Sequence, residues 1–192
     1  MTAPTWNLKT IFPGGLQGEP FLTALSSAEA EVGDLLVRGD ALPALPEQCS
    51  AWVSWLLAVD EITRQLWQCS TFSHCLTSAD TSDRVAARAE ARARAAIARL
   101  GRAWVGPEEH LAHGSDAGFE MLVSQSEIAH MRPMLEKIRR NGSLLLPLSQ
   151  QQLVRELAED GLYGWGSLYD RISGQLELDI DGESIAVGQA NN

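Results

Sequence analysis

Few residues of this chain have the types and the spacing that could do chemistry. Its histidines are His74, His110, His113 and His130. None of them is followed by glutamate, so the zinc-protease motif H-E-x-x-H is absent. The nearest substitute is the stretch EEHLAH, in which Glu109, His110 and His113 could meet on one helical turn and hold a metal ion through two imidazoles and a carboxylate. The alternative is that they are exposed polar residues at the start of a helix after Pro107.

No other catalytic constellation is visible. No glycine-rich phosphate loop follows a predicted strand, no G-x-S-x-G elbow occurs, and no spacing of Ser, His and Asp picks out a triad. We therefore assign no catalytic and no cofactor-binding residue to this chain. The cysteines Cys49, Cys69 and Cys75 all fall in one predicted helix, so we expect reduced packing thiols in place of a disulfide or metal framework.

The composition excludes some classes of function. The chain has 192 residues, and a hydrophobic content of 45% with 21% charged residues is typical of a soluble globular protein. A net charge of −10 argues against nucleic acid as the main partner, because phosphate binding needs a basic surface. No secretory signal is evident, and the longest apolar run, around Trp52 to Val59, is too short to span a membrane. We expect a cytoplasmic protein.

The elements that must position any site are mainly helical. Apolar residues at a 3.6-residue period predict a first helix from Glu19 to Arg38, with Gly39 where it should stop. A second helix should begin near Pro46 and fade near Leu76. Its apolar face is expected to comprise Trp52, Trp55, Leu56, Val59, Ile62 and Leu66. After the capping stretch SADTSD, a third helix rich in alanine and arginine should run to about Trp104.

The third helix carries an arginine ladder at Arg84, Arg88 and Arg92. Like charges four residues apart repel mildly on an isolated helix. We therefore expect acidic groups of neighbouring elements to face this ladder. The alternative is a site for an anion or a peptide carboxylate.

Proline and glycine divide the rest of the chain. We expect a break at Gly106-Pro107, and a helix from Ser124 to Arg140 that Pro133 either kinks or divides. Gly161 fits the left-handed position that ends a helix. In the helix that follows, Gly164 and Gly166 flank Trp165, which indicates close backbone contact with a neighbour and a buried indole.

The C-terminal stretch QLELDIDGESIAV alternates apolar and polar residues around Asp181-Gly182, a hairpin signal. A type I′ turn at these two residues would make Leu178 face Ile185 and Leu176 face Val187. The predicted fold class is therefore mainly α, a bundle of about six to seven helices over residues 19–173, with a C-terminal β-hairpin at about 175–187.

Three stretches carry a family resemblance: WNLKTIFPGG at Trp6 to Gly15, SADTSD after a long helix, and LSQQQLVRELAEDGLYGWGSLYDRISGQLEL at Leu148 to Leu178. In these the chain resembles the N-terminal region of the oligoendopeptidase F family of zinc metallopeptidases, relatives of thimet oligopeptidase. The family's zinc motif lies downstream of the equivalent of Leu178, in a catalytic domain that these 192 residues do not contain.

The resemblance implies a helical N-terminal domain, residues 1–192, that forms part of the wall or lid of a deep channel. In the intact enzyme, zinc would be held by two histidines of the motif and a distal glutamate, and short oligopeptides would be the substrates. The expected partners are the catalytic domain and, through an exposed packing surface, further copies of the chain. Packing roles, not catalytic ones, are expected for Trp6, Phe12, Gly161, Trp165, Leu168 and Tyr169.

Three hypotheses follow from the sequence. The chain is the N-terminal domain of an oligoendopeptidase and inactive alone, or a stand-alone helical interaction module without catalysis, or a small metal-dependent enzyme built on EEHLAH. The first predicts a surface that is unusually apolar for a monomer, because a wall is separated from its catalytic half.

Overall fold

The computed structural model describes residues 7–45, 49–180 and 183–186 and is mainly helical, as the sequence predicts. The α-helices are α1 (Glu19–Asp40), α2 (Cys49–Ala79), α3 (Arg84–Ala103), α4 (Val105–His113), α5 (Asp116–Val123), α6 (Arg132–Arg140), α7 (Leu148–Ala158) and α8 (Gly164–Gln175). Short 3-10 turns lie at Leu8–Thr10, Gly15–Gln17, Ser126–Met131 and Gly142–Leu144, and a π-helical turn lies at Glu159–Tyr163. Over these ranges no helix has both the length and the apolar character that a membrane crossing requires.

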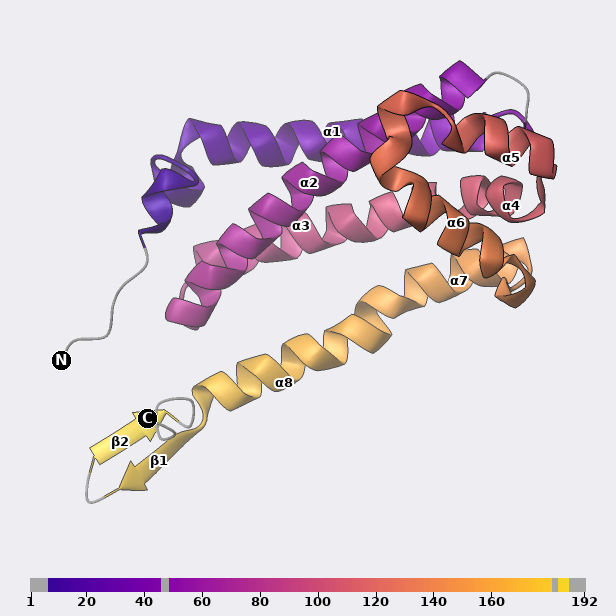
Figure 1. Cartoon of the computed structure of the whole chain (residues 1–192). Helices are drawn as coiled ribbons and strands as arrows, with labels where there is room; N and C mark the ends of the chain where they lie inside the picture. Colours follow the sequence, from indigo (N-terminus) through magenta and orange to yellow (C-terminus); the bar gives the residue numbers. More distant parts are fainter. Residues whose placement is uncertain (1–6, 46–48, 181–182, 187–192) are drawn as a thin grey trace.

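Three long helices form an elongated bundle to which the rest of the chain is added (Figure 1). Helices α1, α2 and α3 lie side by side, and the short helices α4, α5 and α6 gather at one end of them. From that end α7 leads into α8, which runs back along the bundle toward its other end. This arrangement places α7 and α8 opposite α2 and α3.

The core lies where α1, α2 and α3 meet, and it confirms the predicted apolar face of α2. Every residue expected on that face is buried: Trp52, Trp55, Leu56, Val59, Ile62 and Leu66. The two indoles also satisfy their polar groups, since Trp52 Nε1 donates to Pro43 O at 2.9 Å and Trp55 Nε1 donates to Leu35 O at 3.0 Å. Small residues of α3, among them Ala93 and Ala96, are buried against this face and allow close helix packing.

Gly39 does not end the first helix as expected, because α1 continues to Asp40. The structure gives another reason for a glycine at this position. A Cβ atom there would lie 2.9 Å from Ala103 O and 3.2 Å from Trp55 Nε1. Gly39 therefore permits the close approach of α1 to α2 and to the end of α3.

Phe12, one of the residues expected to pack, is buried at the N-terminal end of the bundle. Its ring contacts Phe21 and Phe72 edge-on, with centroid distances of 5.2 and 5.0 Å. After Pro13, Gly14 and Gly15 have φ of 84° and 65°, values that favour glycine, and they turn the chain toward α1. Trp6, the other expected packing residue of this stretch, lies outside the described residues.

The expected break at Gly106-Pro107 is wrong by a few residues. The chain leaves α3 at Trp104, and α4 begins at Val105. Pro107 lies in the first turn of α4, where backbone N–H groups have no intrahelical partner and proline is tolerated. For Pro133 the structure decides between the two alternatives, because it lies at the start of α6 and so divides the predicted helix.

Helix α3 begins at a side-chain cap within the SADTSD stretch. The carboxylate of Asp83 accepts hydrogen bonds from the backbone N–H groups of Val85 and Ala86, at 2.8 and 3.0 Å. Asp83→Ala should lower the free energy of unfolding by about 1 kcal/mol, since those N–H groups lose their acceptor. Thermal denaturation followed by circular dichroism measures this change. Asp34→Ala, in the interior of α1, is the matched control, and an equal loss in both variants would contradict the capping role.

The prediction that Gly161 ends a helix is wrong. Backbone hydrogen bonding continues from α7 through the π turn Glu159–Tyr163 into α8, and Gly161 does not have a positive φ. A Cβ atom at Gly166, one of the two glycines that flank Trp165, would meet no neighbour within 4 Å, so the expected close backbone contact is absent at this position. The close approach occurs further along, at Gly174, where a Cβ atom would lie 3.0 Å from Thr81 Cγ2.

Two short strands follow α8. Strand β1 (Glu177–Ile180) pairs antiparallel with β2 (Glu183–Ala186), and Leu178 lies opposite Ile185 in this register. The predicted turn residues Asp181 and Gly182, and Val187 of the second predicted pair, lie outside the described residues.

The three cysteines are not joined by a disulfide, and they should differ sharply in reactivity. Burial raises the pKa of Cys69 to about 11, whereas Cys75 is exposed. At pH 8, about one in a thousand Cys69 thiols would be the reactive thiolate, even if reagent reached it. We expect Ellman's reagent to modify Cys75 rapidly and Cys69 only with unfolding. Cys75→Ser should remove the fast phase and Cys69→Ser should leave it intact. A fast phase that survives Cys75→Ser and disappears in Cys69→Ser would contradict this assignment.

Candidate functional site

The expected metal candidates lie on α4 but do not form a site. His113 Nε2 is 3.6 Å from Glu109 Oε1, while the His110 ring packs edge-on against Trp52 at a centroid distance of 6.3 Å. Across residues 7–45, 49–180 and 183–186, no group of three His, Cys, Asp or Glu side chains could hold a metal ion. The geometry of the described residues therefore gives no support to the hypothesis of a small metal enzyme built on EEHLAH. These residues do not fit zinc, and no catalytic step can be derived through a metal here.

The arginine ladder of α3 is only partly matched by acidic neighbours. Arg92 forms a two-contact ion pair with Glu29 of α1, with distances of 3.0 Å from Nε and 2.6 Å from an Nη atom. This pair also raises the pKa of Arg92. Within the described residues, no ion pair reaches Arg84 or Arg88, which are exposed.

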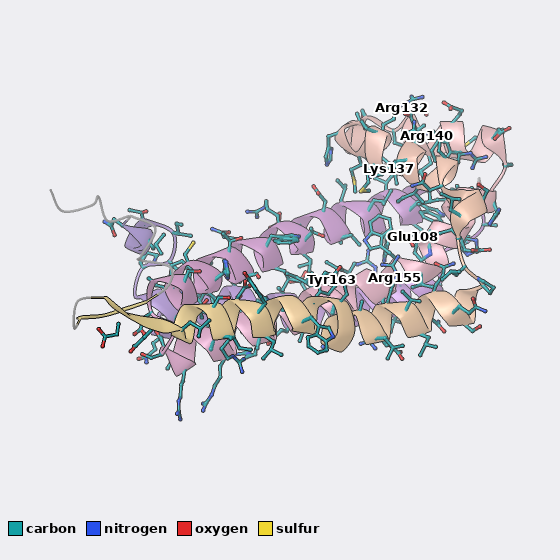
Figure 2. The ribbon with its side chains drawn as sticks, turned by 90° about the horizontal axis from the view of Figure 1, so that it is seen from below. Glu108, Arg132, Lys137, Arg140, Arg155 and Tyr163 are labelled. Atoms are coloured by element: carbon teal, nitrogen blue, oxygen red, sulfur yellow. The ribbon has the colours of Figure 1, made fainter. Side chains whose placement is uncertain are left out.

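A groove of about 610 Å³ lies between α2 and α3 on one side and α7, the π turn and α8 on the other. Trp67 of α2, Ile97 of α3 and Tyr163 of the π turn contribute apolar surface to it. Figure 2 shows Tyr163 about midway along the α7–α8 wall. At the α4 end, Arg155 of α7 pairs with Glu108 of α4 at 2.5 Å, and this half-buried ion pair joins the two walls.

A polar cluster lies inside the groove and is centred on Glu90, the only acidic residue of α3. Its carboxylate is 12% exposed and accepts from Thr77 Oγ1 at 2.7 Å and from Arg94 at 2.6 Å. His74 Nδ1 lies 3.0 Å from the same carboxylate. Arg94 also donates to Ser167 Oγ and thereby connects α3 to α8 across the groove. The cluster fixes the distance between the two walls.

We expect Glu90→Gln to lower the free energy of unfolding by roughly 1 kcal/mol, because a charge-assisted bond to Arg94 becomes a neutral one. Urea unfolding measures the change. Glu31→Gln, an exposed glutamate without an ion pair in the described structure, is the matched control and should change stability by less than about 0.5 kcal/mol. If both variants lose equal stability, Glu90 does not organise the groove.

The opposite side of α7 and α8 is uncovered and apolar. We call it the outer stripe, and each of its residues is at least half exposed: Leu153, Leu157, Leu162, Trp165, Tyr169, Ile172 and, directly after α8, Leu176. Leu162 lies at the edge of the stripe, because it also lines the groove. Trp165 and Tyr169 are each 72% exposed, so the expected burial of the indole within this chain is wrong. The inward side of α8 carries small and polar residues instead, among them Gly166 and Ser167. Leu168, 43% exposed, lies beside the stripe.

The π turn aligns the two halves of the outer stripe. Leu157 and Leu162 are five residues apart, a separation that an α-helix places on different faces. A π turn forms i→i+5 hydrogen bonds and so accommodates one more residue in the turn. The extra residue brings α7 and α8 into register, and the stripe runs along both helices.

Glu90, Arg94 and Ser167 were missed as a cluster by sequence reasoning. The signal available was a single acid in a helix otherwise made of alanine, arginine and apolar residues. Nothing in the sequence places Ser167 next to Arg94, 73 residues earlier.

One comparison with known proteins gives a match. Residues 111–177 match the model of the M3 peptidase N-terminal family, described as Oligopeptidase F. This segment runs from α4 into β1 and contains α7 and α8. It shows a similarity to the N-terminal domain of a family of metallopeptidases and confirms the resemblance to the oligoendopeptidase F family. No curated protein and no solved structure matches the chain.

Proposed function

We propose that this chain is the N-terminal helical region of a zinc metallopeptidase similar to oligoendopeptidase F, and that it forms a wall or lid of the channel in which short oligopeptides are hydrolysed. The observation that carries the proposal is the match over residues 111–177, which includes the α7–α8 wall of the groove. Catalysis then belongs to a zinc-bearing segment outside residues 1–192. The chain by itself is inactive, and the intact enzyme acts in the cytoplasm.

The groove supports this role because of its shape and lining. It lies between two helical walls, and its side chains combine apolar surface with the polar cluster around Glu90. Binding sites for small ligands are commonly concave, mostly apolar and supplied with a few fixed polar groups. A groove walled by helices admits an extended peptide more readily than a folded protein, which agrees with short oligopeptides as substrates.

A second candidate is a stand-alone helical interaction module without catalysis. The exposed apolar surface of the outer stripe is what a domain separated from its catalytic half should show, and it is also compatible with a module that binds a partner. The two candidates make different predictions for the reading frame beyond Asn192. A module requires no zinc motif there, and a peptidase requires one.

The test is to follow the reading frame beyond Asn192 and to express the complete protein beside residues 1–192. We expect an H-E-x-x-H segment downstream, zinc in the complete protein, and cleavage of short fluorogenic peptides by the complete protein only. The matched control replaces the glutamate of that motif by glutamine. Cleavage by residues 1–192 alone, or a complete protein with neither motif nor peptidase activity, would refute the proposal.

A further inference from the structure

The outer stripe needs a partner. Single apolar residues on a surface are ordinary, but a continuous row of seven large side chains, each at least half exposed, marks an interaction surface. The row extends along α7, the π turn and α8, and Figure 1 shows this pair as one long rod at the side of the bundle. No other described element covers it.

The stripe is symmetric about Trp165. Three residues of the stripe precede Trp165 and three follow it, at nearly equal separations along the sequence. Reversing the direction of the helix therefore leaves the spacing of the apolar residues nearly unchanged. In an antiparallel pair of identical stripes, Leu153 lies opposite Leu176, and Leu157 lies opposite Ile172. Leu162 lies opposite Tyr169, and the two copies of Trp165 meet at the centre. This is the self-complementary contact that a two-fold symmetric dimer requires.

We infer that the outer stripe binds the outer stripe of a second copy of this chain, with the α7–α8 rods antiparallel and a two-fold axis at Trp165. The inference does not rest on the proposed function, because it concerns residues 1–192 as they stand. A zinc-bearing segment is the alternative occupant of the stripe, and the experiment separates the two.

Charge complementarity supports the antiparallel arrangement. Glu156 and Arg171 flank the stripe on the same side of the rod, near its two ends. Arg171 has no ion pair in the described structure, and Glu156 approaches only Arg102, at 3.8 Å. In an antiparallel pair the same flanks meet, so Glu156 of one copy lies within about one turn of Arg171 of the other. Because the axis is two-fold, this ion pair occurs twice in the dimer.

A parallel arrangement would not form these ion pairs. Each stripe residue would then lie beside the same residue of the other copy. Glu156 would be separated from Arg171 of the other copy by fifteen residues, roughly 22 Å along the helix. The two charges therefore distinguish the direction of pairing.

The surface available is large enough for a stable dimer. Two aromatic side chains of about 150–250 Å² and five aliphatic ones, all at least half exposed, offer on the order of 800 Å² per copy, the usual size of a specific interface. Aromatic residues at the centre of such a contact commonly contribute most of the binding free energy. Trp165 has this position.

The experiment is sedimentation equilibrium of residues 1–192. We expect a concentration-dependent dimer that Trp165→Gln weakens by at least roughly 100-fold, because both copies lose their central anchor. Trp67→Gln is the matched control, since Trp67 is also an exposed tryptophan, at 57%, but belongs to the α2 wall of the groove and not to the stripe. Far-ultraviolet circular dichroism should show equal helix content in both variants, as neither indole is buried.

A charge exchange tests the direction of pairing. Glu156→Arg and Arg171→Glu should each raise the dissociation constant of the dimer by roughly tenfold, since each creates two like-charge contacts. The double variant Glu156→Arg/Arg171→Glu should recover the affinity of the parent. A chain that stays monomeric would overturn the inference and leave the zinc-bearing segment as the occupant of the stripe. Failure of the double variant to recover affinity, or equal dissociation by Trp67→Gln, would overturn it as well.

Discussion

Trp55→Ala should lower the free energy of unfolding by about 3–5 kcal/mol, the range for truncating a buried tryptophan. The Trp55 side chain is fully buried, and its ring packs against Trp52 and Trp104 at centroid distances of 6.5 and 4.9 Å. Removing the indole leaves a cavity and deprives Leu35 O of the hydrogen bond donated by Nε1. A domain of ordinary stability has only about 5–15 kcal/mol in total, so this variant should be partly unfolded at 37 °C.

Urea denaturation with helix content as the signal measures the effect. Trp67→Ala is the matched control and should cost less than about 1 kcal/mol, because its indole is largely exposed. Equal losses in the two variants would show that the core is not centred on α2.

Gly39→Ala should destabilise the protein by about 1–3 kcal/mol, although alanine is the better helix former by about 1 kcal/mol. The added methyl group would lie 2.9 Å from Ala103 O, a backbone atom that cannot rotate away, and 3.3 Å from Trp55 Cζ2. The helices would have to separate, and the packing lost along α1 and α2 outweighs the gain in propensity.

Gly33→Ala, on the same helix, has the opposite expectation. Its nearest neighbour would be an Arg99 Nη atom at 3.8 Å, so nothing must move, and stability should rise by about 0.5–1 kcal/mol. Thermal denaturation of both variants measures whether each change lowers or raises the melting temperature relative to the parent. A stabilised Gly39→Ala variant would contradict the close packing of α1 against α2 and α3.

The sequence predicted best what depends on a repeating pattern within one helix. The apolar face of α2 is buried as expected, because residues such as Leu56 and Ile62 recur at the helical period and must face a core. The family resemblance was recognisable above all because its longest stretch, Leu148 to Leu178, is continuous in sequence, and the match over residues 111–177 covers nearly all of that stretch.

The candidate site could not be predicted in the same way. The groove exists because α8 runs back along α3, and the bond from Arg94 to Ser167 spans 73 residues of sequence. For α8 the periodicity identified Trp165 and Tyr169 as parts of one apolar face. The periodicity does not tell whether another part of the same chain packs against that face, and in this structure none does among the described residues. Gly161 fitted a helix end equally well, since local sequence rarely distinguishes a stop from a π turn.

The π turn makes the number of residues between α7 and α8 a constraint in its own right. Deleting one residue from Glu159–Tyr163 would allow ordinary i→i+4 hydrogen bonding, and α8 would keep its register with α7. A further insertion, by contrast, would rotate α8 by about 100° about the helix axis and break the outer stripe. Among related sequences, a one-residue gap in an alignment should therefore be found across these five positions more often than elsewhere in α7 and α8.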